Sequence, residues 1–399
     1  MTKALIIGAG IGGLTAAIAL ARIGFEVEVF EKSARVEDIG GGIQQSPNAM
    51  AVWTALGLAD KITALSCEPK AGILRDYKTG VALMTTTMHD VYEARYGHKY
   101  LHIHRADLVN ILLKETQRLG VTIHFGRPCE EVQHINDRVN IIAGQINAVG
   151  DILIGADGIK SLIRQDIIGE TSPVFTKQVA WRGLVETEKL PKDFIPFAAN
   201  NWLGPNRHFV SYYVRGGKLI NFVAVEERGE WTDQGWRQKA DKSELQTAFQ
   251  GWDNRVMCLI EACEESYLWG LFDHPPLSKW TDRTMTLLGD AAHPMLPFMA
   301  QGAAMAIEDG WVLAHFLSKN PNNLEQALTN YETARQPRTS ALQKTSRDNA
   351  KLYHQSAGFG RTVRNLKFKI GSHVPQAVFA RLDKIYGVDV TRDYPISFN

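Results

Sequence analysis

Cysteine and net charge are both scarce in this chain of 399 residues. The four cysteines form no C-x-x-C pair and have no metal-ligand spacing, which argues against structural zinc and for a reducing compartment. The formal net charge is +1, with charges spread along the chain, so nothing in the composition points to nucleic acid or to an anionic membrane. No repeat, low-complexity run or long linker divides the sequence. We expect a compact cytosolic protein, monomeric or homodimeric, with two domains or one domain carrying a large insertion.

One long apolar run is present, at residues 4–21, with Thr15 as its single polar residue. Behind a lysine, such a run is also typical of a signal peptide or a membrane span. Four glycines within residues 8–13 suit neither of these. The strand that follows, ending at Glu31, has no place in either of them. A nucleotide-binding interpretation is therefore favoured.

The first 31 residues predict a strand–turn–helix–strand unit. An apolar strand at 4–7 leads into the sequence GAGIGG at 8–13, a helix at 14–22 and an alternating strand at 26–31. An acidic residue about 20 positions after the glycines completes the fingerprint of a dinucleotide-binding fold.

Each glycine of this turn has an expected purpose. Gly8 permits the tight turn, Gly10 lets a pyrophosphate approach the backbone, and Gly13 lets the helix pack closely on the strand. The helix N-terminus offers unpaired N–H groups to the phosphates. Glu31 is expected to accept hydrogen bonds from the adenosine ribose. The candidate binding positions here are Gly8, Gly10, Gly12, Gly13, Glu31 and Lys32.

A second glycine-rich segment, GDAAHP at residues 289–294, follows an apolar strand that begins at Met285. The strand delivers Asp290 to its carboxyl end, where α/β folds place ligands. A helix is expected from Gln301, and Gly302 leaves room at its start for a flat ring whose reduced form is anionic. Alternatively, Asp290 caps a helix and Gly302 makes a turn. Two such segments nearly three hundred residues apart indicate one long dinucleotide held at both ends, which points to FAD.

The middle of the chain has a different character. Residues 179–271 are rich in β-forming and aromatic residues, and RGGK at 215–218 predicts a hairpin turn between two alternating strands. This pattern predicts a mostly antiparallel sheet inserted into a parallel α/β domain. The glycines at 40–42 indicate a backbone lying close to something bulky, or else a plain connection. From Leu324 onward the sequence is helical and charged.

The chain resembles the group A FAD-dependent monooxygenases, the p-hydroxybenzoate hydroxylase-like aromatic hydroxylases. Three motifs carry the resemblance: G-x-G-x-x-G at 8–13 with Glu31, D-G-x-x-S-x-x-R at 157–164, and GDAAHP at 289–294 continuing to Gly302. Within the family it looks most similar to salicylate hydroxylase, 3-hydroxybenzoate 6-hydroxylase and 6-hydroxynicotinate 3-monooxygenase. The similarity spans roughly residues 3 to 340.

The resemblance implies a fold and its boundaries. The expected fold is α/β: a Rossmann-like FAD-binding domain, an inserted mostly antiparallel substrate sheet and a C-terminal helical segment. The predicted FAD-binding domain comprises residues 1–70, 100–178 and 275–340. The substrate domain comprises 71–99 and 179–274, and the helical segment 341–399.

The resemblance also implies roles at the cofactor. Arg105 would bind the pyrophosphate or ribityl region, Asp290 the ribityl or phosphate portion, and Gly302 and Ala303 would lie under the isoalloxazine. Asp157 matches a motif associated with both FAD and NAD(P)H; the alternative is a helix cap, with Ser161 and Arg164 on the surface. The remaining cofactor-binding candidates are Gln44 and Cys129. FAD is expected to be noncovalent, with NADH or NADPH docking transiently because no second G-x-G-x-x-G is present.

The expected chemistry follows from that cofactor. NAD(P)H reduces FAD, and O2 then forms a C4a-hydroperoxide that attacks an electron-rich phenol. A base near the phenol and a dry pocket both help. His208 is the candidate base because its ordinary pKa lies near working pH; the alternative is a packed or surface histidine. Tyr212 and Pro297 are further catalytic candidates.

The substrate is less constrained. Gln44 stands where the hydroxynicotinate-hydroxylating relatives have histidine. Arg182 and Arg207 are each a candidate clamp for a substrate carboxylate or else a surface charge. We expect a small phenolic acid, salicylate-like or 3-hydroxybenzoate-like, with a larger phenol or a quinolone as alternatives. Two other functions stay open: a different FAD enzyme on this scaffold, such as an oxidase or prenyl reductase, and a flavin-binding protein without turnover.

Overall fold

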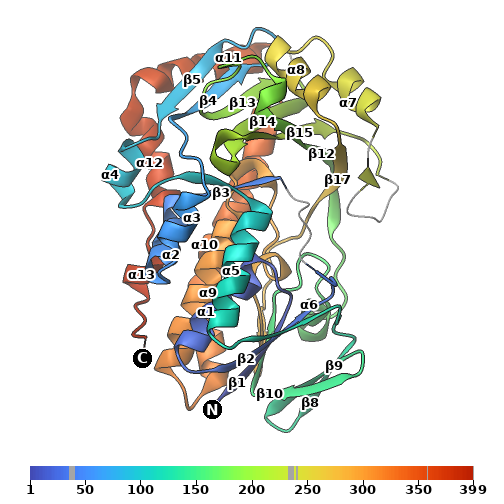
Figure 1. Cartoon of the computed structure of the whole chain (residues 1–399), viewed down its shortest axis with the longest axis vertical. Coiled ribbons are helices and arrows are strands. Elements are labelled where there is room, and N and C mark those ends of the chain that lie inside the picture. The colour runs from blue at the N-terminus through green and yellow to red at the C-terminus, as the bar shows by residue number, and fades with distance from the viewer. Residues whose placement is uncertain (36–40, 232–237, 240, 357, 399) are drawn as a thin grey trace.

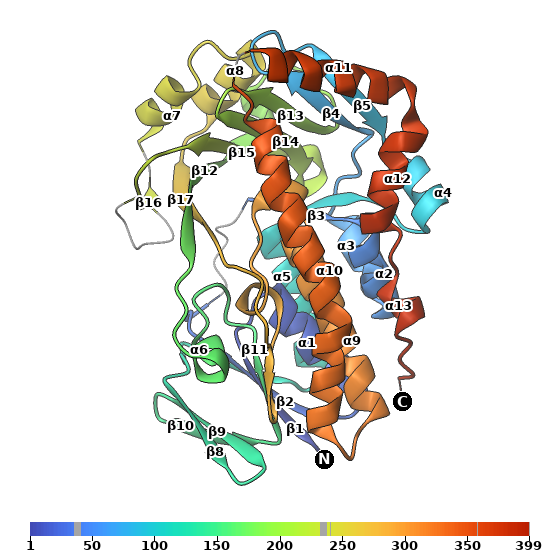
Figure 2. The same ribbon diagram turned by 180° about the vertical axis from the view of Figure 1, so that it is seen from behind.

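Two large sheets lie at opposite ends of the molecule, and two long helices run between them (Figure 1). The structure, a computed structural model, describes residues 1–35, 41–231, 238–239, 241–356 and 358–398. The long helices are α9 (Gly302–Lys319) and α10 (Leu324–Tyr353). In the view from behind, α10 extends from the lower sheet to the upper one (Figure 2).

The lower sheet has six strands among the described residues, and five of them run parallel. The edge strand β18 is antiparallel to its neighbour. Crossover helices α1 (Ile11–Arg22) and α5 (Arg105–Arg118) join these strands. In sheet order the strands are β18 (Thr281–Asp282), β19 (Met285–Leu287), β11 (Ile152–Gly155), β1 (Lys3–Ile7), β2 (Glu26–Glu31) and β7 (Thr122–Phe125). This is the predicted dinucleotide-binding arrangement.

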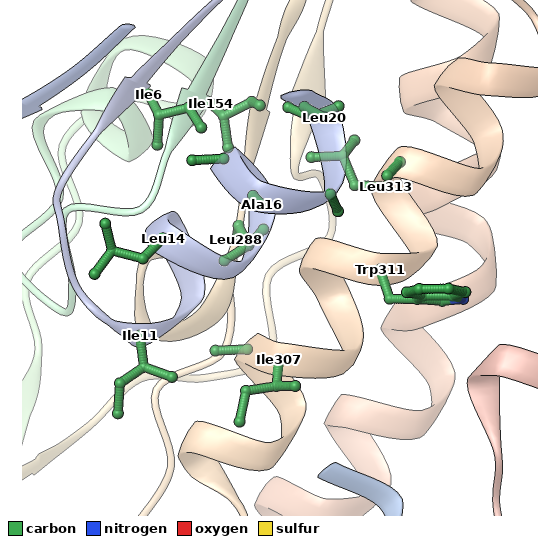
Figure 3. Close-up of a cluster of buried hydrophobic side chains, with 14 of the residues drawn as sticks. Ile6, Ile11, Leu14, Ala16, Leu20, Ile154, Leu288, Ile307, Trp311 and Leu313 are labelled. Atoms are coloured by element: carbon green, nitrogen blue, oxygen red, sulfur yellow. The ribbon is translucent and has the colours of Figure 1, made fainter. Parts of the chain in front are cut away.

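Helix α1 is packed between this sheet and α9 (Figure 3). It begins at Ile11, three residues earlier than predicted, because the low helix propensity of glycine is outweighed here by close packing. A Cβ at Gly12 would lie 2.9 Å from the Cβ of Ala306, and one at Gly310 would lie 2.8 Å from the backbone nitrogen of Ala16. The two helices are therefore in near-backbone contact, which fixes α9 against the glycine turn.

The upper sheet has eight described strands, all antiparallel to their neighbours except the β13–β4 pair. It is the predicted inserted sheet. In sheet order it comprises β16 (Gln238–Lys239), β17 (Ser266–Asp273), β12 (Val174–Glu186), β15 (Leu219–Glu227), β14 (Arg207–Val214), β13 (Ala199–Gly204), β4 (Ala71–Asp76) and β5 (Ala82–Thr87).

Alternation along β14 separates two faces of this sheet. Phe209 is buried with Trp202 and Phe222 in a core that includes apolar residues of α7 (Lys242–Ala248) and α8 (Asn254–Ala262). Because successive side chains point to opposite faces, His208 and Tyr212 lie together on the other face. That face is directed toward the lower sheet, and it forms one wall of the cavity described below.

Smaller elements complete the chain. Two small sheets are formed by β8 (Glu131–Ile135), β9 (Arg138–Ala143) and β10 (Ile146–Gly150), and by β3 (Gly42–Gln45) with β6 (Leu101–His104). The remaining helices and 3-10 turns are α2 (Pro47–Ala55), α3 (Ala59–Ala64), α4 (Val91–Tyr96), α6 (Leu162–Ile168), α11 (Phe359–His373), α12 (Pro375–Tyr386), α13 (Val390–Asp393), η1 (Thr187–Lys189), η2 (Arg215–Gly217), η3 (Gly289–Ala291) and η4 (Pro297–Met299).

The C-terminal segment is helical and folds back over the rest of the molecule. Helix α11 packs on β5, and Phe379 of α12 lies against Tyr92 of α4. The predicted division after residue 340 falls inside the continuous helix α10, so the domain boundaries stay a prediction. Of the helices described, none is long and apolar enough to cross a lipid bilayer.

Candidate active site

A cavity of about 1190 Å³ lies between the two sheets. All sixteen residues that the sequence marked as cofactor-binding or catalytic line it, although they come from many separate segments of the chain. The glycine turn and Asp290 belong to the lower half, and His208 and Tyr212 belong to the upper sheet. The fold therefore brings the two groups of candidates to one cavity.

The glycine turn has the geometry that a dinucleotide requires. Gly8 has φ +106°, and a Cβ there would lie 2.4 Å from the carbonyl oxygen of Ala156. A Cβ at Gly13 would lie 2.0 Å from the carbonyl oxygen of Gly8, so only glycine fits between helix and strand. Gly10 has no atom within 4 Å of a Cβ, and it lines the cavity. Its backbone is thus open to a phosphate group at the start of α1.

Glu31 lies at the carboxyl end of β2 and is already held by the chain. Its two carboxylate oxygens accept hydrogen bonds of 2.8 Å from the backbone N–H groups of Ala9 and Ser33. Each oxygen keeps a second lone pair, so the carboxylate can still accept from a ribose hydroxyl. Lys32 and Cys129 line the same end of the cavity. Burial raises the pKa of the Cys129 thiol to about 12, which keeps it neutral.

Only one of the two carboxylate oxygens of Asp157 accepts a hydrogen bond from the described residues. Its Oδ2 accepts a hydrogen bond of 2.8 Å from the N–H of Leu162, at the start of α6. Its Oδ1 is buried and has no hydrogen-bond partner among the described residues. A buried carboxylate oxygen without a partner is unfavourable, and this one belongs to a residue that lines the cavity. A hydroxyl or amide of a bound dinucleotide would satisfy it.

The expectation that Ser161 and Arg164 are surface residues, in the helix-cap alternative, is wrong. Both are buried, with 0% and 1% of their surface exposed. Ser161 caps α6 by accepting a hydrogen bond from the N–H of Arg164, whose guanidinium donates 3.0 Å to the carbonyl of Ala291. Arg164 thereby ties the second motif to the third. This role of Arg164 could not be predicted from sequence spacing, since Arg164 and Ala291 are 127 residues apart.

The third motif presents a carboxylate to the cavity beside the start of α9. A Cβ at Gly302 would lie 3.9 Å from Oδ1 of Asp290, which is ordinary contact. Burial raises the pKa of Asp290, and the nearby His293 and Arg105 offset this rise only in part. Arg105 is exposed at the first residue of α5 and lines the cavity, as does Ala303. These residues fit a polar ribityl chain that leads from the phosphates toward the upper sheet.

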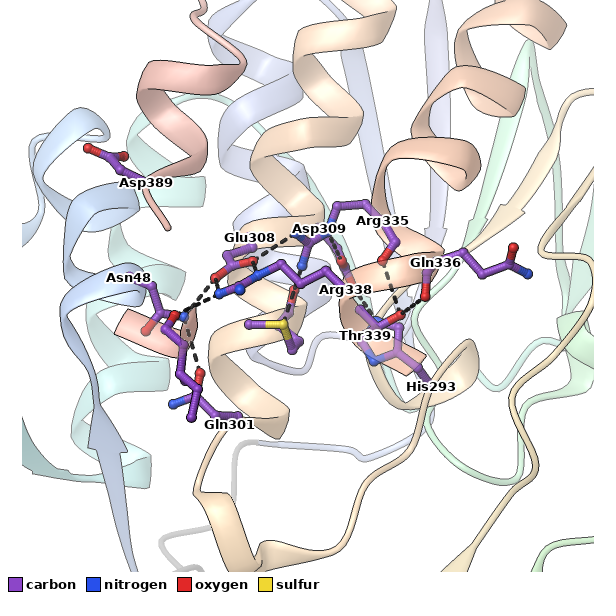
Figure 4. A network of polar contacts seen from close by, with 12 residues as sticks. Asn48, His293, Gln301, Glu308, Asp309, Arg335, Gln336, Arg338, Thr339 and Asp389 are labelled. Atoms are coloured by element: carbon purple, nitrogen blue, oxygen red, sulfur yellow. Dashed lines mark hydrogen bonds and ion pairs between the residues drawn. The ribbon is translucent and has the colours of Figure 1, made fainter. Parts of the chain in front are cut away.

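A buried network of charges holds this motif in place (Figure 4). His293 and Arg335 lie 2.6 Å and 2.7 Å from the two carboxylate oxygens of Asp309, which also accepts from the N–H of Gly289. Arg335 and Arg338 both pair with Glu308. Burial alone would raise the pKa of Asp309 and Glu308, but the neighbouring cations outweigh it and hold both below their usual values. Helix α10 is thereby fastened to α9 under the motif.

We expect Arg335→Leu to lower the free energy of unfolding by about 3–5 kcal/mol, since it removes one of the two cationic partners from each of two buried carboxylates. Thermal or denaturant unfolding of the protein loaded with FAD measures this. Lys344→Gln on the same helix is the control: its ion pair with Asp348 is exposed, so the change should stay within about 0.5 kcal/mol. Equal effects of the two substitutions would contradict the structural importance of the network.

The catalytic candidates lie on the upper wall of the cavity. His208 is 3% exposed, and its Nδ1 lies 2.8 Å from Nε2 of His354. Pro297 begins η4, and the next residue, Phe298, places its ring 5.2 Å from the His208 ring. Burial lowers the pKa of His208 well below its ordinary value, so the imidazole is neutral near pH 7. A neutral imidazole at the cavity wall can accept a proton.

Tyr212 holds the second glycine-rich loop against the upper sheet. A Cβ at Gly42 would lie 2.4 Å from the Tyr212 ring, and the Gly42 N–H donates 2.7 Å to Oδ1 of Asn221. The bulky group facing this loop therefore belongs to the protein itself; Gly40 lies outside the described residues. Burial raises the pKa of Tyr212, so it keeps its proton and does not act as the base. Gln44 accepts a hydrogen bond from the Tyr100 hydroxyl.

The sequence missed the contribution of the C-terminal helices to the cavity. Tyr353 at the end of α10, Lys367 of α11 and Arg381 of α12 all line it, and His354 contacts His208. No motif marks these residues. The tyrosine next to a histidine at the end of a long charged helix was the available signal, but only the folded chain brings them to the sheet.

The two candidate clamps for a carboxylate are separated by the structure. Arg182 lines the cavity, its guanidinium lies 4.6 Å from the centre of the Trp269 ring, and its Nε is buried without a partner among the described residues. Arg207 is paired with Glu226 at 3.3 Å and is not among the residues described as lining the cavity. Arg182 is therefore the cation available to a ligand.

One cavity is lined by the glycine turn at 8–13, by Asp290 of the third motif and by the upper sheet. This combination defines the class of FAD-dependent monooxygenases. Comparison with known proteins agrees: residues 1–346 match the FAD binding domain family, and the chain belongs to that family. The resemblance to the group A aromatic hydroxylases is thereby confirmed, and the protein is an FAD-dependent aromatic monooxygenase with NAD(P)H as electron donor.

Two relatives and one solved structure illustrate the similarity. The chain is 37% identical over 361 residues to 3-amino-4-hydroxybenzoate 2-monooxygenase of Streptomyces platensis, covering 90% of each chain. It is 34% identical over 388 residues to 3-hydroxybenzoate 6-hydroxylase of Polaromonas naphthalenivorans, covering 97% of this chain and 96% of the relative. A salicylate hydroxylase structure with bound substrate superimposes with a TM-score of 0.82 at 25% identity, covering 98% and 97% of the two chains.

Proposed function

We propose that the protein hydroxylates a small aromatic acid that carries a ring hydroxyl, with salicylate-like and 3-hydroxybenzoate-like compounds favoured. The observation that carries this proposal is that His208 and Arg182, both on the substrate sheet, line the same cavity. A neutral imidazole suits the hydroxyl, and a guanidinium whose buried Nε has no partner among the described residues suits a carboxylate. The names of the related enzymes, a hydroxybenzoate hydroxylase and an aminohydroxybenzoate monooxygenase, support the same substrate chemistry.

FAD would be held by the glycine turn, Glu31, Arg105, Asp157 and Asp290, and would supply acceptance of hydride from NAD(P)H and activation of O2. His208 would accept the proton of the substrate hydroxyl. The resulting phenolate is a stronger nucleophile than the phenol, so proton removal at this position lowers the barrier to hydroxylation. The apolar wall at residues 294–299 would keep water away from the reacting atoms.

The sheet geometry supports the relative placement of base and clamp. Arg182 pairs with Val223 across β12 and β15, and Val223 pairs with Val210 across β15 and β14. Val210 is two residues from His208, so it points to the same face. A ring bound over Val210 and Val223 would therefore have the base at one side and the guanidinium at another.

We expect Arg182→Met to raise the KM for a phenolic acid by about 10- to 100-fold with little change in kcat, because a charge-assisted hydrogen bond contributes about 1.5–3 kcal/mol. The assay is NAD(P)H oxidation in air with salicylate and 3-hydroxybenzoate, run with each nicotinamide cofactor. Arg207→Met is the matched control and should leave KM unchanged. Equal KM values for all three proteins would rule out Arg182 as the clamp.

The same screen tests the alternative functions. A larger phenol or a quinolone that outperforms the small acids would replace the proposed substrate class. Direct reduction of the flavin by an amine or a hydroxy acid, without NAD(P)H, would favour an oxidase. A monomeric or homodimeric state and a cytosolic location stay part of the proposal.

A further inference from the structure

His208 belongs to a chain of three side chains that leads from the cavity to the surface. Its Nδ1 lies 2.8 Å from Nε2 of His354, and Nδ1 of His354 lies 3.1 Å from Oε1 of Glu227. The side chain of His354 is 2% exposed, whereas that of Glu227 is 45% exposed. One end of the chain therefore lines the active-site cavity, and the other end meets solvent.

The fold fixes this chain from three directions. Helix α10 extends up to the substrate sheet and ends there (Figure 2), and His354 follows its last residue. The N–H of Asn206 donates 3.1 Å to the carbonyl of His354, and the N–H of Glu227 donates 2.9 Å to the carbonyl of Asn206. Backbone hydrogen bonds thus hold the end of α10, the turn before β14 and the end of β15 in one arrangement.

The hydrogen-bond directions along the chain follow from the carboxylate. An ionised Glu227 can only accept, so Nδ1 of His354 donates to it. Burial lowers the pKa of both histidines, so His354 is neutral and its Nε2 is left as an acceptor. Nδ1 of His208 must then donate to that nitrogen. A neutral His208 in this tautomer carries its lone pair on Nε2, the nitrogen that has no hydrogen-bond partner among the described residues.

We propose that His354 and Glu227 form a proton path that sets His208 in the base-competent tautomer and carries the substrate proton from the cavity to solvent. This inference rests on the proposed function, in which His208 accepts the proton of a phenol. The substrate O–H bond breaks and an Nε2–H bond forms on His208. The Nδ1 proton of His208 passes to Nε2 of His354, and the Nδ1 proton of His354 passes to Glu227 and then to water. No electrons are transferred, and one proton leaves for each phenol bound.

The surroundings of the chain favour this direction of transfer. The aromatic rings of Phe298 and Tyr353 lie 5.2 Å and 5.5 Å from the His208 ring, so no charge from these elements stabilises an imidazolium there. At His354, Glu227 favours the protonated form and Arg207, which is paired with Glu226, opposes it. A proton accepted at His208 is thus attracted outward by the Glu227 carboxylate.

The test measures proton release and phenolate formation in stopped flow, with oxidised FAD-loaded enzyme, 3-hydroxybenzoate and a pH indicator in weakly buffered solution. The variants are His354→Gln, which keeps an acceptor for His208 but cannot pass a proton, and Glu227→Gln. His315→Gln and Glu186→Gln, a half-buried histidine of α9 outside the residues that line the cavity and an exposed glutamate of β12, are the matched controls. FAD content and melting temperature verify that each protein is folded.

We expect both controls to release one proton at the wild-type rate. His354→Gln should slow proton release and phenolate formation at pH 7 by at least about tenfold, within the range of general-base effects, and Glu227→Gln should slow them by less. Near pH 10 the substrate ionises unaided, so the rates of variants and wild type should converge. A merely structural role of His354 would not give this recovery.

The outcomes separate this inference from the proposed function. One outcome is that His208→Asn loses proton release, while His354→Gln and Glu227→Gln both retain the wild-type rate at pH 7. In that case the proton path is wrong, and His208 remains the proposed general base. If the wild-type enzyme binds no phenolic acid and forms no phenolate, the proposed function itself is wrong. Should His354→Gln fail to fold, Glu227→Gln at the exposed end decides the question alone.

Discussion

Replacing His208 with asparagine lowers the rate of hydroxylation by about 10²- to 10⁴-fold at pH 7, the effect expected when a general base is removed. FAD binding and the melting temperature change little, because His208 lies on the substrate sheet and is not one of the residues expected to bind the cofactor. The measurement is product formation in a single turnover, with bound FAD monitored by absorbance. His315→Asn, far from the cavity wall, should retain full activity.

The wild-type enzyme and the His208→Asn variant should differ in how the hydroxylation rate depends on pH. Because burial holds the pKa of His208 well below its ordinary value, the imidazole is neutral and able to accept a proton throughout the neutral pH range. The wild-type rate should therefore be flat over neutral pH and fall only in acid. In the asparagine variant the rate should rise with pH toward the ionisation of the phenol, near pH 10. Parallel profiles in the two proteins would exclude His208 as the base.

The second large effect concerns the glycine turn. Gly10→Ala should leave folding intact and weaken FAD binding by about 10- to 100-fold, because the new methyl group enters the open space where the pyrophosphate must approach. Gly13→Val should abolish FAD binding and destabilise the protein as well, since a Cβ there lies 2.0 Å from the carbonyl oxygen of Gly8. Fluorescence titration of apoprotein with FAD, together with thermal unfolding, distinguishes the two results.

Gly229→Ala is the control for this pair: the residue is exposed, and no atom lies within 4 Å of its Cβ position. It should bind FAD as the wild type does. If Gly10→Ala binds FAD normally, the pyrophosphate does not lie against this turn, and the placement of the cofactor is wrong.

Local patterns were sufficient to predict the nucleotide half of the molecule. The strand, turn, helix and second strand of residues 3–31 are adjacent in sequence, and their order alone matches the dinucleotide-binding fingerprint. The start of α1 was misplaced because Gly12 and Gly13 have low helix propensity. Close packing overrides that preference: Gly12 packs against α9, a segment almost three hundred residues away, and Gly13 packs against Gly8.

The catalytic half could be predicted only in part. His208 was named as the candidate base because it stands at the start of an aromatic strand, and Arg207 and Arg182 were left as equal candidates for a carboxylate clamp. Alternation along β14 separates Arg207 from Arg182. Residues 207 and 208 must point to opposite faces of the sheet, so Arg207 points away from the face that carries His208. His354 and Arg381 could not be found in this way. Their positions depend on how a helix of 30 residues and the two that follow it fold back over the cavity.

The most direct test of the central claim is the fate of molecular oxygen in turnover with salicylate or 3-hydroxybenzoate. We expect mass spectrometry after reaction under ¹⁸O2 to show one labelled oxygen atom in each hydroxylated product, with the amount of product matching the NAD(P)H consumed. Flavin that is reduced by NAD(P)H but yields only hydrogen peroxide with every phenolic acid tested would contradict the account.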